Sequence, residues 1–486
     1  MSRINTNVGS LIAQHSLQQT NRDLNVSLQR LSTGLAINRG ADDPAGLIVS
    51  ERLRNEIGGV NKAISNIERA SNVLSTTEAA LAEVSELLTS MKGLVVEAAN
   101  TGAFSEEEIA ANQLQIDSAI ESITRISNSA SFGGLKLLNG SLDYIVSGVN
   151  STNLPDVNVF GANFGTNSSI PVSVEVINSA EQASLFISGN NAASPGALQS
   201  SVSFELQGAE GVEVFEFASG TTLSAVAFAI NSVSDATGVN ASLVDPANQT
   251  SGLVLNSNSF GSDAFVSVRK LDDGDFFQTY DAQGGSAITR DTGEDILALV
   301  NGSLALGDGT DVSFRSSTIN VEMSFSEAAA QTLGTHEFSV IGGGANFQVG
   351  GQVNSSQQIG FGIQSVAASN LGDRTNGHLS SVQSGGDNSL VAGRAREASV
   401  IIDKAIDQVA ILRGRLGAFE RNTLDTAARS QQIALENLTA SESRIRDTDF
   451  AKETAELTRA QILQQAGTSA LSTANSTPQN VLSLLQ

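Results

Sequence analysis

Apolar residues recur at every seventh position near the start of the chain, over a length that a compact domain cannot hold. One unbroken row consists of Val60, Ile67, Leu74, Leu81, Leu88 and Val95. A second row consists of Ile57 and Ile64 and then Val84, Met91 and Ala98, which predicts a shift of register near residues 71–78. Two apolar rows sustained over about five heptads are typical of a coiled coil. A helix over residues 55–99 would be roughly 65 Å long, so it needs a helical partner along its length.

The far end of the chain has the same period and can supply that partner. Its two rows consist of Ile402, Val409 and Leu416, and of Ala405, Leu412 and Phe419. A capping box from Ser105 to Glu108 predicts the start of one more helix after the first long one. Because coiled-coil helices need partners, we predict that both chain ends form one long antiparallel coiled coil.

Residues 146–389 differ in character from the ends. Alternating runs such as VSVEVI, SVSFELQ and INVEMSF predict strands with one buried face. Residues 221–244 predict a short helix that precedes a further strand. The predicted fold class is therefore α+β, with a long antiparallel helical coiled coil and an inserted, mainly β outer region of one or two domains. The alternative is two ordinary terminal helices that lie on one globular core.

The inserted region is strongly acidic. The chain has a net charge of −24, and residues 146–390 hold 24 acidic residues against 5 basic ones. Phosphate binding needs a basic patch and none is present, so we expect no nucleic-acid partner. Adhesion to another surface through this acidic middle is one alternative function.

The two chain ends carry more apolar residues than one pair of helices can bury. Apolar residues near both termini point in several helical directions. We expect such ends to become ordered when copies of the chain assemble. The predicted self-assembly interface consists of Ile4, Leu11, Leu17, Leu24, Leu28, Leu31, Leu35, Ile462, Leu463, Leu471, Val481, Leu482, Leu484 and Leu485.

No residue pattern predicts catalysis, a metal site or a cofactor. The chain has no Cys, which excludes disulfides, thiolate zinc sites and cysteine nucleophiles. His336 and Glu337 begin an H-E-x-x-H pattern, but Val340 stands where the second His would be. An acidic cluster among glycines consists of Asp272, Asp273, Asp275 and Asp281. Its spacing is not that of a calcium-binding loop, so a solvated turn is the favoured interpretation.

Long ordered motifs at both ends make the sequence closely resemble bacterial flagellin, the subunit of the flagellar filament. The motifs are SRINTNVGSLIAQHSL, LQRLSTGLAINRGADDPAGLIVSERLR, SFGGLKLLNG and RIRDTDFAKETAELTRAQILQQAGTSALSTANSTPQNVLSLLQ. The likeness covers residues 1–140 and 390–486, and the middle resembles the variable outer region of the family. The resemblance implies a structural protein, not an enzyme, that self-assembles into the filament used for swimming.

The resemblance also implies a division into segments. Residues 1–44 and 447–486 would form an inner tube, residues 45–145 and 390–446 an outer tube, and residues 146–389 a variable surface-exposed region. Asp42, Asp43 and Pro44 would form the bend between the two tubes, or equally a plain helix cap.

The partners that the resemblance implies are copies of the chain, a flagellar export chaperone, junction proteins and the filament cap. We expect no membrane insertion, because no run of about 18 apolar residues is present. The first residues also lack the apolar core of a cleavable signal. Export would therefore follow the family's type III route to the extracellular flagellum. The Ser- and Thr-rich middle is compatible with O-linked glycans, and a hook–filament junction protein is the alternative within the same family.

An innate Toll-like receptor senses many flagellins through a helical segment that corresponds to residues 87–100 here. This chain keeps Leu94, but it has Ser90 where the family pattern has arginine and Gly93 where it has glutamate. Because the loss of a charged anchor at the centre of an interface costs about 2 kcal/mol or more, we predict weak or no receptor activation. A reporter-cell assay measures this, and full activation by low nanomolar monomer would contradict it.

Overall fold

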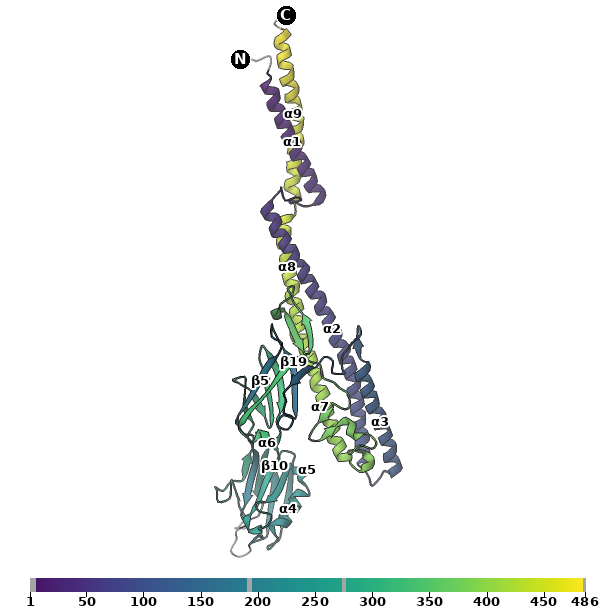
Figure 1. The fold of residues 1–486 in the computed structure, drawn as a ribbon, viewed down its shortest axis with the longest axis vertical. Helices are drawn as coiled ribbons and strands as arrows, with labels where there is room; N and C mark the ends of the chain where they lie inside the picture. Colours follow the sequence, from purple (N-terminus) through teal and green to yellow (C-terminus); the bar gives the residue numbers. More distant parts are fainter. Residues whose placement is uncertain (1–5, 190–194, 273–276, 484–486) are drawn as a thin grey trace. The chain divides into compact units, whose positions relative to one another are not determined.

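The computed structural model describes residues 6–189, 195–272 and 277–483, with side chains in the last helix described up to residue 476. Long helices from both chain ends flank a region of strands, so the predicted α+β class is confirmed (Figure 1). The chain divides into two compact units. The helical unit consists of residues 1–70, 348–357 and 421–486, and the mixed unit of residues 71–347 and 358–420.

Two antiparallel helix pairs build the helical unit. Helices α1 (Val8–Thr33) and α9 (Phe450–Ser483) lie side by side, with both chain termini at the same end of the pair (Figure 1). Helix α1 ends at Gly34, whose φ of 74° suits glycine. The first part of α2 (Pro44–Ala98) pairs with α8 (Asp425–Arg446), where Arg446 forms an ion pair with Glu51 (2.9 Å).

In the mixed unit, the rest of α2 packs antiparallel to α7 (Ala395–Phe419). Glu78 pairs with Arg413 (2.8 Å), and two heptads further along α2 Lys92 donates to Ser399 Oγ (2.6 Å). Residues 78 and 92 rise along α2 while their partners fall along α7, so the predicted antiparallel coiled coil is confirmed. A π-helical turn, Glu420–Leu424, follows α7.

The predicted shift of register near residues 71–78 is wrong. Apart from Val73, which is buried beside Leu74, buried positions follow one another in steps of three and four from Val60 to Ala98, within one uninterrupted helix. The second buried row consists of Ala63, Ala70, Thr77, Val84, Met91 and Ala98. The angular position of a residue around the helix decides whether it lies in the seam, and the size of its side chain does not. Small residues therefore occupy seam positions, while the bulkier Ile57 and Ile64 lie beside the seam and are only half-buried.

Helix α3 (Glu106–Ser129) completes the helical part of the mixed unit. It begins at the predicted capping box, where Glu108 N donates to Ser105 Oγ (3.3 Å) and Ser105 N to Glu108 Oε2 (2.8 Å). A short hairpin follows, made of β1 (Ser131–Phe132) and β2 (Leu135–Lys136). Gly133 and Gly134 both have positive φ at its turn, as a tight hairpin requires.

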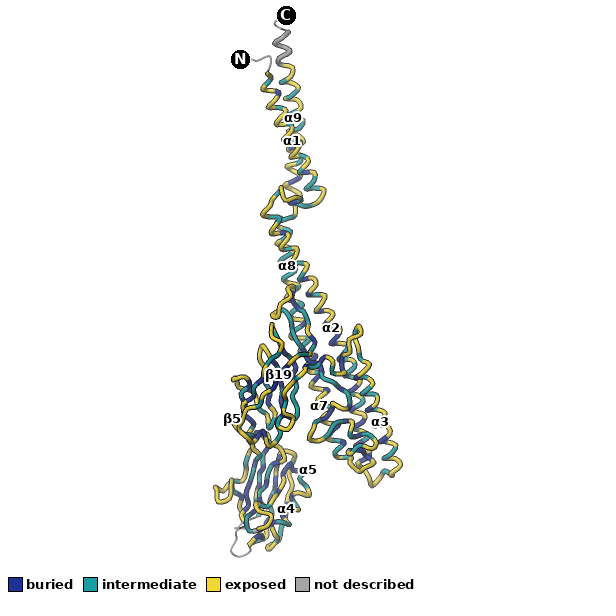
Figure 2. Tube along the Cα trace, viewed as in Figure 1, coloured by how far each residue is buried: buried dark blue, intermediate teal, exposed yellow. Residues whose placement is uncertain are grey.

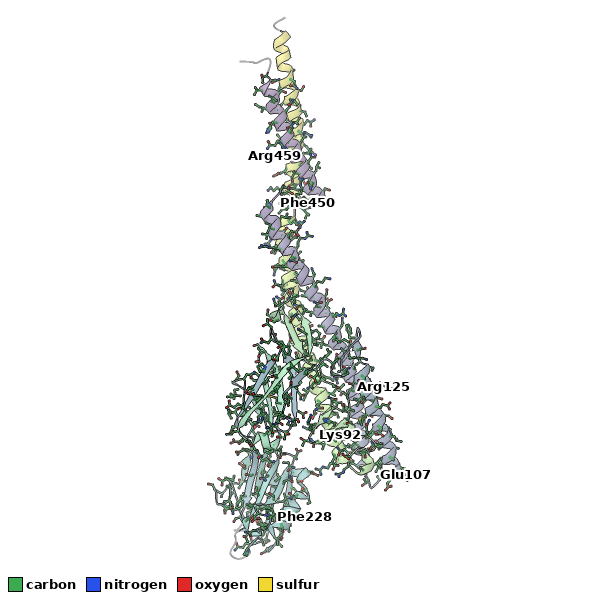
Figure 3. The ribbon with its side chains drawn as sticks, in the orientation of Figure 1. Lys92, Glu107, Arg125, Phe228, Phe450 and Arg459 are labelled. Carbon is green, nitrogen blue, oxygen red and sulfur yellow. The ribbon has the colours of Figure 1, made fainter. Side chains whose placement is uncertain are left out.

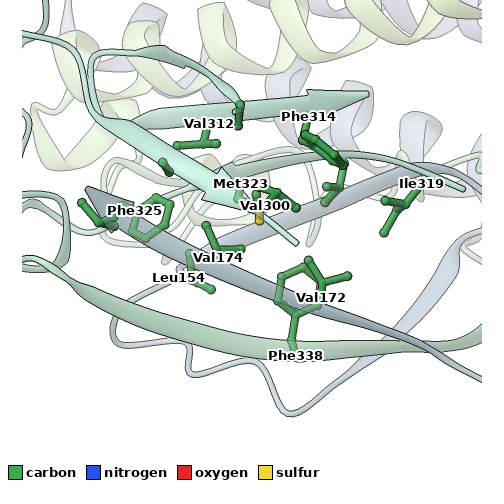
Figure 4. Packing of buried hydrophobic residues seen from close by; sticks show 14 of the residues in the cluster. Leu154, Val172, Val174, Val300, Val312, Phe314, Ile319, Met323, Phe325 and Phe338 are labelled. Atoms are coloured by element: carbon green, nitrogen blue, oxygen red, sulfur yellow. The ribbon is translucent and has the colours of Figure 1, made fainter. Parts of the chain in front are cut away.

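The inserted region contains two hydrophobic cores, each between two antiparallel sheets. The first core lies between a five-stranded sheet (order β15-β14-β5-β19-β3) and a four-stranded sheet (order β16-β17-β18-β4). Side chains from both sheets meet there, among them Val172 and Val174 from one and Val312 and Met323 from the other (Figure 4). The strands are β3 (Tyr144–Ser147), β4 (Asp156–Ala162), β5 (Ile170–Asn178), β14 (Leu297–Val300), β15 (Ser303–Leu304), β16 (Leu306–Asp308), β17 (Asp311–Arg315), β18 (Ile319–Ser324) and β19 (Gly334–Gly343).

The second core lies between two four-stranded sheets, with orders β12-β6-β10-β9 and β13-β11-β7-β8. The predicted short helix is α4 (Leu223–Asn231), which buries Leu223, Val226 and Ile230 in this core. The strands are β6 (Gln182–Ile187), β7 (Val202–Gln207), β8 (Val212–Phe217), β9 (Val239–Leu243), β10 (Leu253–Phe260), β11 (Phe265–Lys270), β12 (Thr279–Tyr280) and β13 (Arg290–Thr292).

The remaining elements are short. They are α5 (Ser234–Thr237), α6 (Glu327–Ala330), β20 (Ala345–Gln348), β21 (Gln358–Phe361), β22 (Gly372–Asp373), β23 (Gly377–His378) and the 3-10 turns η1 (Gln249–Ser251), η2 (Ser355–Gln357), η3 (Leu379–Val382) and η4 (Leu390–Ala392). The last two turns are tied to α3 by the buried side chain of Gln113. Its Nε2 donates to Val382 O (2.8 Å), and its Oε1 accepts from Leu390 N (2.7 Å).

Leu81→Ala should destabilise the helical part of the mixed unit by about 2–5 kcal/mol, because Leu81 is fully buried in the α2 seam and its truncation leaves a cavity. Denaturant unfolding followed by far-UV circular dichroism measures the change. Val96→Ala on the same helix is the control, since Val96 is 59% exposed and should change stability by less than about 0.5 kcal/mol. Equal effects of the two substitutions would contradict the seam.

Asp143→Asn should raise the melting temperature of the mixed unit at neutral pH by a few degrees. Burial raises the pKa of Asp143 from its ordinary value of 3.8 to about 6, against a weaker hydrogen bond from Tyr144 N. The folded state therefore holds this proton more tightly, and stability is lost as pH rises from about 4 through 6. Melting curves at several pH values should show the advantage of the variant shrinking toward zero near pH 4. Glu337→Gln, at an exposed position of β19, is the matched control.

Candidate assembly surface

The seam between α1 and α9 combines small and polar side chains with leucines that are only half-buried. Only Ser10 and Ser27 of α1 are buried, and Leu17, Leu24 and Leu31 are half-buried. The inward positions of α9 are Glu453, Leu457, Ala460, Gln464, Gly467, Leu471 and Ala474. Such a seam buries little apolar area, so the pair gains less from the hydrophobic effect than the α2 seam does.

The two helices approach closely, and polar side chains fix their register. A Cβ at Gly467 would lie 3.4 Å from Leu17 Cδ1. Asn7 Nδ2 donates to Ala474 O (2.8 Å), and Gln464 Nε2 donates to Asn21 Oδ1 (2.8 Å). These bonds join residues from opposite ends of the sequence.

Large apolar side chains project away from this seam. The exposed set consists of Val8 (53% exposed), Leu11 (58%), Ile12 (63%) and Leu28 (48%) on α1, and of Phe450 (57%), Ile462 (64%) and Leu463 (51%) on α9. Figure 2 shows that both helices are largely exposed or half-buried, and Figure 3 labels Phe450. A concentration of large apolar side chains on both helices of one pair is typical of a surface that binds another chain.

The predicted interface residues thus fall into two sets. Leu11, Leu28, Ile462 and Leu463 are exposed, whereas Leu17, Leu24, Leu31 and Leu471 are half-buried in the seam, and Leu35 is half-buried in the connection after α1. Ile4, Leu484 and Leu485, and the side chains of Val481 and Leu482, lie outside the described residues. Sequence reasoning left out Val8 and Phe450, which lie near helix ends and outside the heptad rows.

Sequence reasoning also missed a partly buried ion pair at the other end of the seam. Arg30 Nη1 lies 3.5 Å from Glu453 Oε2, and Glu453 is 7% exposed. The sequence contains a hint, since Glu453 occupies the same heptad row as Ala460, Gly467 and Ala474. Charge at a seam position favours one register over others, because any other register leaves the charge unpaired.

The connections next to this ion pair hydrogen-bond to one another. Ala36 N donates to Arg446 O (2.7 Å), and Thr448 N donates to Gly34 O (2.9 Å), on either side of a bridge between Leu35 and Asp447. The chain thus leaves α1 and enters α9 through one paired junction.

Asp42, Asp43 and Pro44 close a turn and begin α2. Asp42 Oδ2 accepts from Arg39 N (2.8 Å) and Asn38 N (3.0 Å), and the bond from Arg39 is the largest cause that lowers the pKa of Asp42. Asp43 Oδ1 accepts from Gly46 N (2.9 Å), and Pro44 is the first helical residue, as in a standard helix cap. The cap is confirmed, and a bend between tubes remains a prediction.

The receptor segment lies near the end of α2. Ser90 and Gly93 are exposed, and Leu94 is half-buried. A Cβ at Gly93 would meet no atom within 4 Å. The predicted lack of receptor activation remains untested.

The residues considered for chemistry have structural partners. His336 lies in β19, with its ring edge-on to Phe325 (5.4 Å between centroids) and Nδ1 3.4 Å from Asn153 Nδ2, and burial lowers its pKa. Asp272 accepts from Ser203 N (2.8 Å) and Asp281 from Ser286 N (2.7 Å), while Asp273 and Asp275 lie outside the described residues. Within the described ranges, no three His, Cys, Asp or Glu side chains are placed to hold a metal ion. No helix in that part of the chain is long and apolar enough to cross a membrane.

Comparison with known families assigns both helical ends and part of the inserted region. The bacterial flagellin N-terminal helical region matches residues 4–143, and the C-terminal helical region matches residues 400–485. The flagellin hook IN motif matches residues 203–259, from β7 to β10.

Two relatives match over nearly their whole length. A B-type flagellin of Pseudomonas aeruginosa is 31% identical over 99% of this chain and 99% of its own. A flagellin of Salmonella typhimurium is 28% identical over 99% of both chains.

Solved structures are similar at a low level. The flagellar hook associated protein-3 of Legionella pneumophila is 13% identical, with a TM-score of 0.32 over 81% of this chain and 98% of its own. The D1-D2-D3 domains of the flagellar cap protein of Escherichia coli are 18% identical, with a TM-score of 0.29 over 46% of this chain and 64% of their own.

Proposed function

The chain belongs to the bacterial flagellin family, and we propose that α1 and α9 form the main surface through which its copies assemble. As a flagellin, it is a structural subunit of the flagellar filament. The observation that supports this surface is the set of large apolar side chains on both helices, which are 48–64% exposed, while the leucines of the seam between the helices are only half-buried.

Assembly would supply the burial that the helix pair lacks. Covering a large apolar side chain contributes about 1.5–3 kcal/mol when it goes from fully exposed to fully buried. Leu11, Ile12, Ile462 and Leu463 are more than half exposed, so each has more than half of that gain still available. In a filament, neighbouring copies would provide the apolar surface that covers these side chains.

The five-segment division follows from the same proposal. Residues 1–44 and 447–486 would build the inner tube, and residues 45–145 and 390–446 the outer tube. The junction at Arg446–Thr448, which pairs with Gly34–Ala36, supports the boundary between residues 446 and 447. Residues 146–389 would project from the filament, which agrees with their acidic, solvated character.

Further expectations concern location and partners. The chain would act outside the cell, after export without a cleaved signal, and it would meet an export chaperone, junction proteins and the filament cap. O-linked glycans would be carried by the inserted region. No catalytic activity is expected, because His336 and the described members of the aspartate cluster are held by structural contacts.

Two alternatives differ in behaviour. A junction protein should add only a short layer to a filament end, whereas this chain should extend filaments without limit. Adhesion through the acidic middle is compatible with filament formation, and a surface-binding assay of filaments tests it separately.

Electron microscopy of the purified chain, seeded with short filament fragments, tests the assembly surface. The full chain should form long tubes, and a chain lacking residues 460–486 should form none. Ile462→Asp should also abolish growth, because it places a charge at an apolar, 64% exposed position without disturbing the α1–α9 seam.

Phe228→Asp is the matched control, since Phe228 is 77% exposed on α4 in the inserted region (Figure 3). It should grow like the unmodified chain. Long tubes from the truncated chain would mean that the last helix serves only its own subunit.

A further inference from the structure

The loop of residues 349–357 closes the β20–β21 hairpin and rests directly on α2. A Cβ at Gly59 would lie 2.7 Å from Gly351 O, and a Cβ at Gly351 would lie 3.1 Å from Gly59 C. The two backbones are therefore in contact, and glycine at both positions permits the approach. Residues 348–357, which lie within the inserted region in sequence, therefore belong to the helical unit.

The loop is held in one conformation by its own amide side chains. Gln348 Nε2 donates to Gly350 O (2.8 Å) and to Gln352 O (2.7 Å). Gln357 Oε1 accepts from Gln352 N (2.7 Å), and Gln357 N donates to Asn354 Oδ1 (3.0 Å). A loop fixed in this way loses little conformational entropy when another surface binds it.

This fixed loop holds one apolar side chain out of the molecule. Val349 is 8% exposed, whereas Val353 is 89% exposed, more than any other large apolar side chain in the described part of the chain. Val353 is β-branched, so its direction is also restricted.

The helix beside the loop has a feature that the single chain does not explain. Gly58 and Gly59 both lie inside α2, where glycine is about 0.5–1 kcal/mol less favourable than alanine. The loop accounts for Gly59. A Cβ at Gly58 would meet no atom within 4 Å.

Charge indicates what approaches this surface. The chain has a net charge of −24, yet it contains no Asp, Glu, Lys, Arg or His from Phe338 to Gly372. Copies of so acidic a chain repel one another, so the uncharged, rigid loop is a place where they can meet at low cost. The α2 face beside it carries exposed Arg54, Glu56 and Lys62.

We propose that the 349–357 loop and the adjoining face of α2 at Gly58 form a contact with a second copy of the chain in the filament. Val353 is the apolar side chain that the neighbour covers, and Gly58 permits its close approach. This inference rests on the filament function and adds a contact outside α1 and α9.

Seeded filament growth of Val353→Asp and Gly58→Leu tests the contact. Both monomers should unfold at the temperature of the unmodified chain or above, because neither side chain has a partner in the monomer and Leu favours a helix more than Gly does. Their critical concentrations for growth should rise by about tenfold or more, as for central residues of an interface.

Leu306→Asp is the matched control, since Leu306 is 74% exposed on β16. Growth of the unmodified chain in the same experiment tests the filament function independently of the loop. Growth of both loop variants at the unmodified critical concentration would overturn the contact. An equal loss in Leu306→Asp would overturn it too, because the effect would then follow from added charge alone.

Discussion

The antiparallel pairing of the two chain ends is the interaction on which everything else in this molecule depends. Hydrogen bonds and ion pairs join Asn7 to Ala474, Arg30 to Glu453, and Glu78 to Arg413. The inserted region leaves the helices and returns to them, so its two cores form apart from these pairs. In the proposed function, the helical part would build the polymer and the β part would project from it.

The two seams differ in how completely their side chains are buried within a single chain. The α2 seam is filled by large side chains such as Leu81, Leu88 and Met91, which are fully buried, so it is stable within one chain. The α1–α9 seam combines small and polar side chains with leucines that are only half-buried, and other large apolar side chains on both helices are exposed. In the proposed assembly, these exposed side chains gain their remaining burial only beside other copies. The uncharged 349–357 loop on α2 is the second surface that we propose other copies cover.

The inserted region illustrates where sequence patterns succeed. The alternating runs VSVEVI, SVSFELQ and INVEMSF correspond to β5, β7 and β18, and residues 221–244 contain the predicted helix, α4, before strand β9. Patterns did not reveal how strands distant in sequence combine into two separate cores, because pairing such as that of β4 with β18 depends on contacts across the whole insertion. Sequence patterns also do not predict that the 349–357 loop contacts α2, because the close approach of two glycines gives no signal in a hydropathy pattern.

Local pattern and long motifs are enough to predict the helical period, the antiparallel pairing of the ends, the α+β class and the resemblance to flagellin. Which apolar residues outside the Val60–Val95 row face inward depends on tertiary packing. It placed Ala63 and Ala70 in the α2 seam, and it divided the terminal leucines between the α1–α9 seam and the exposed surface. The reason is physical: period sets the spacing of a face, but the direction in which that face points depends on the partner that packs against it.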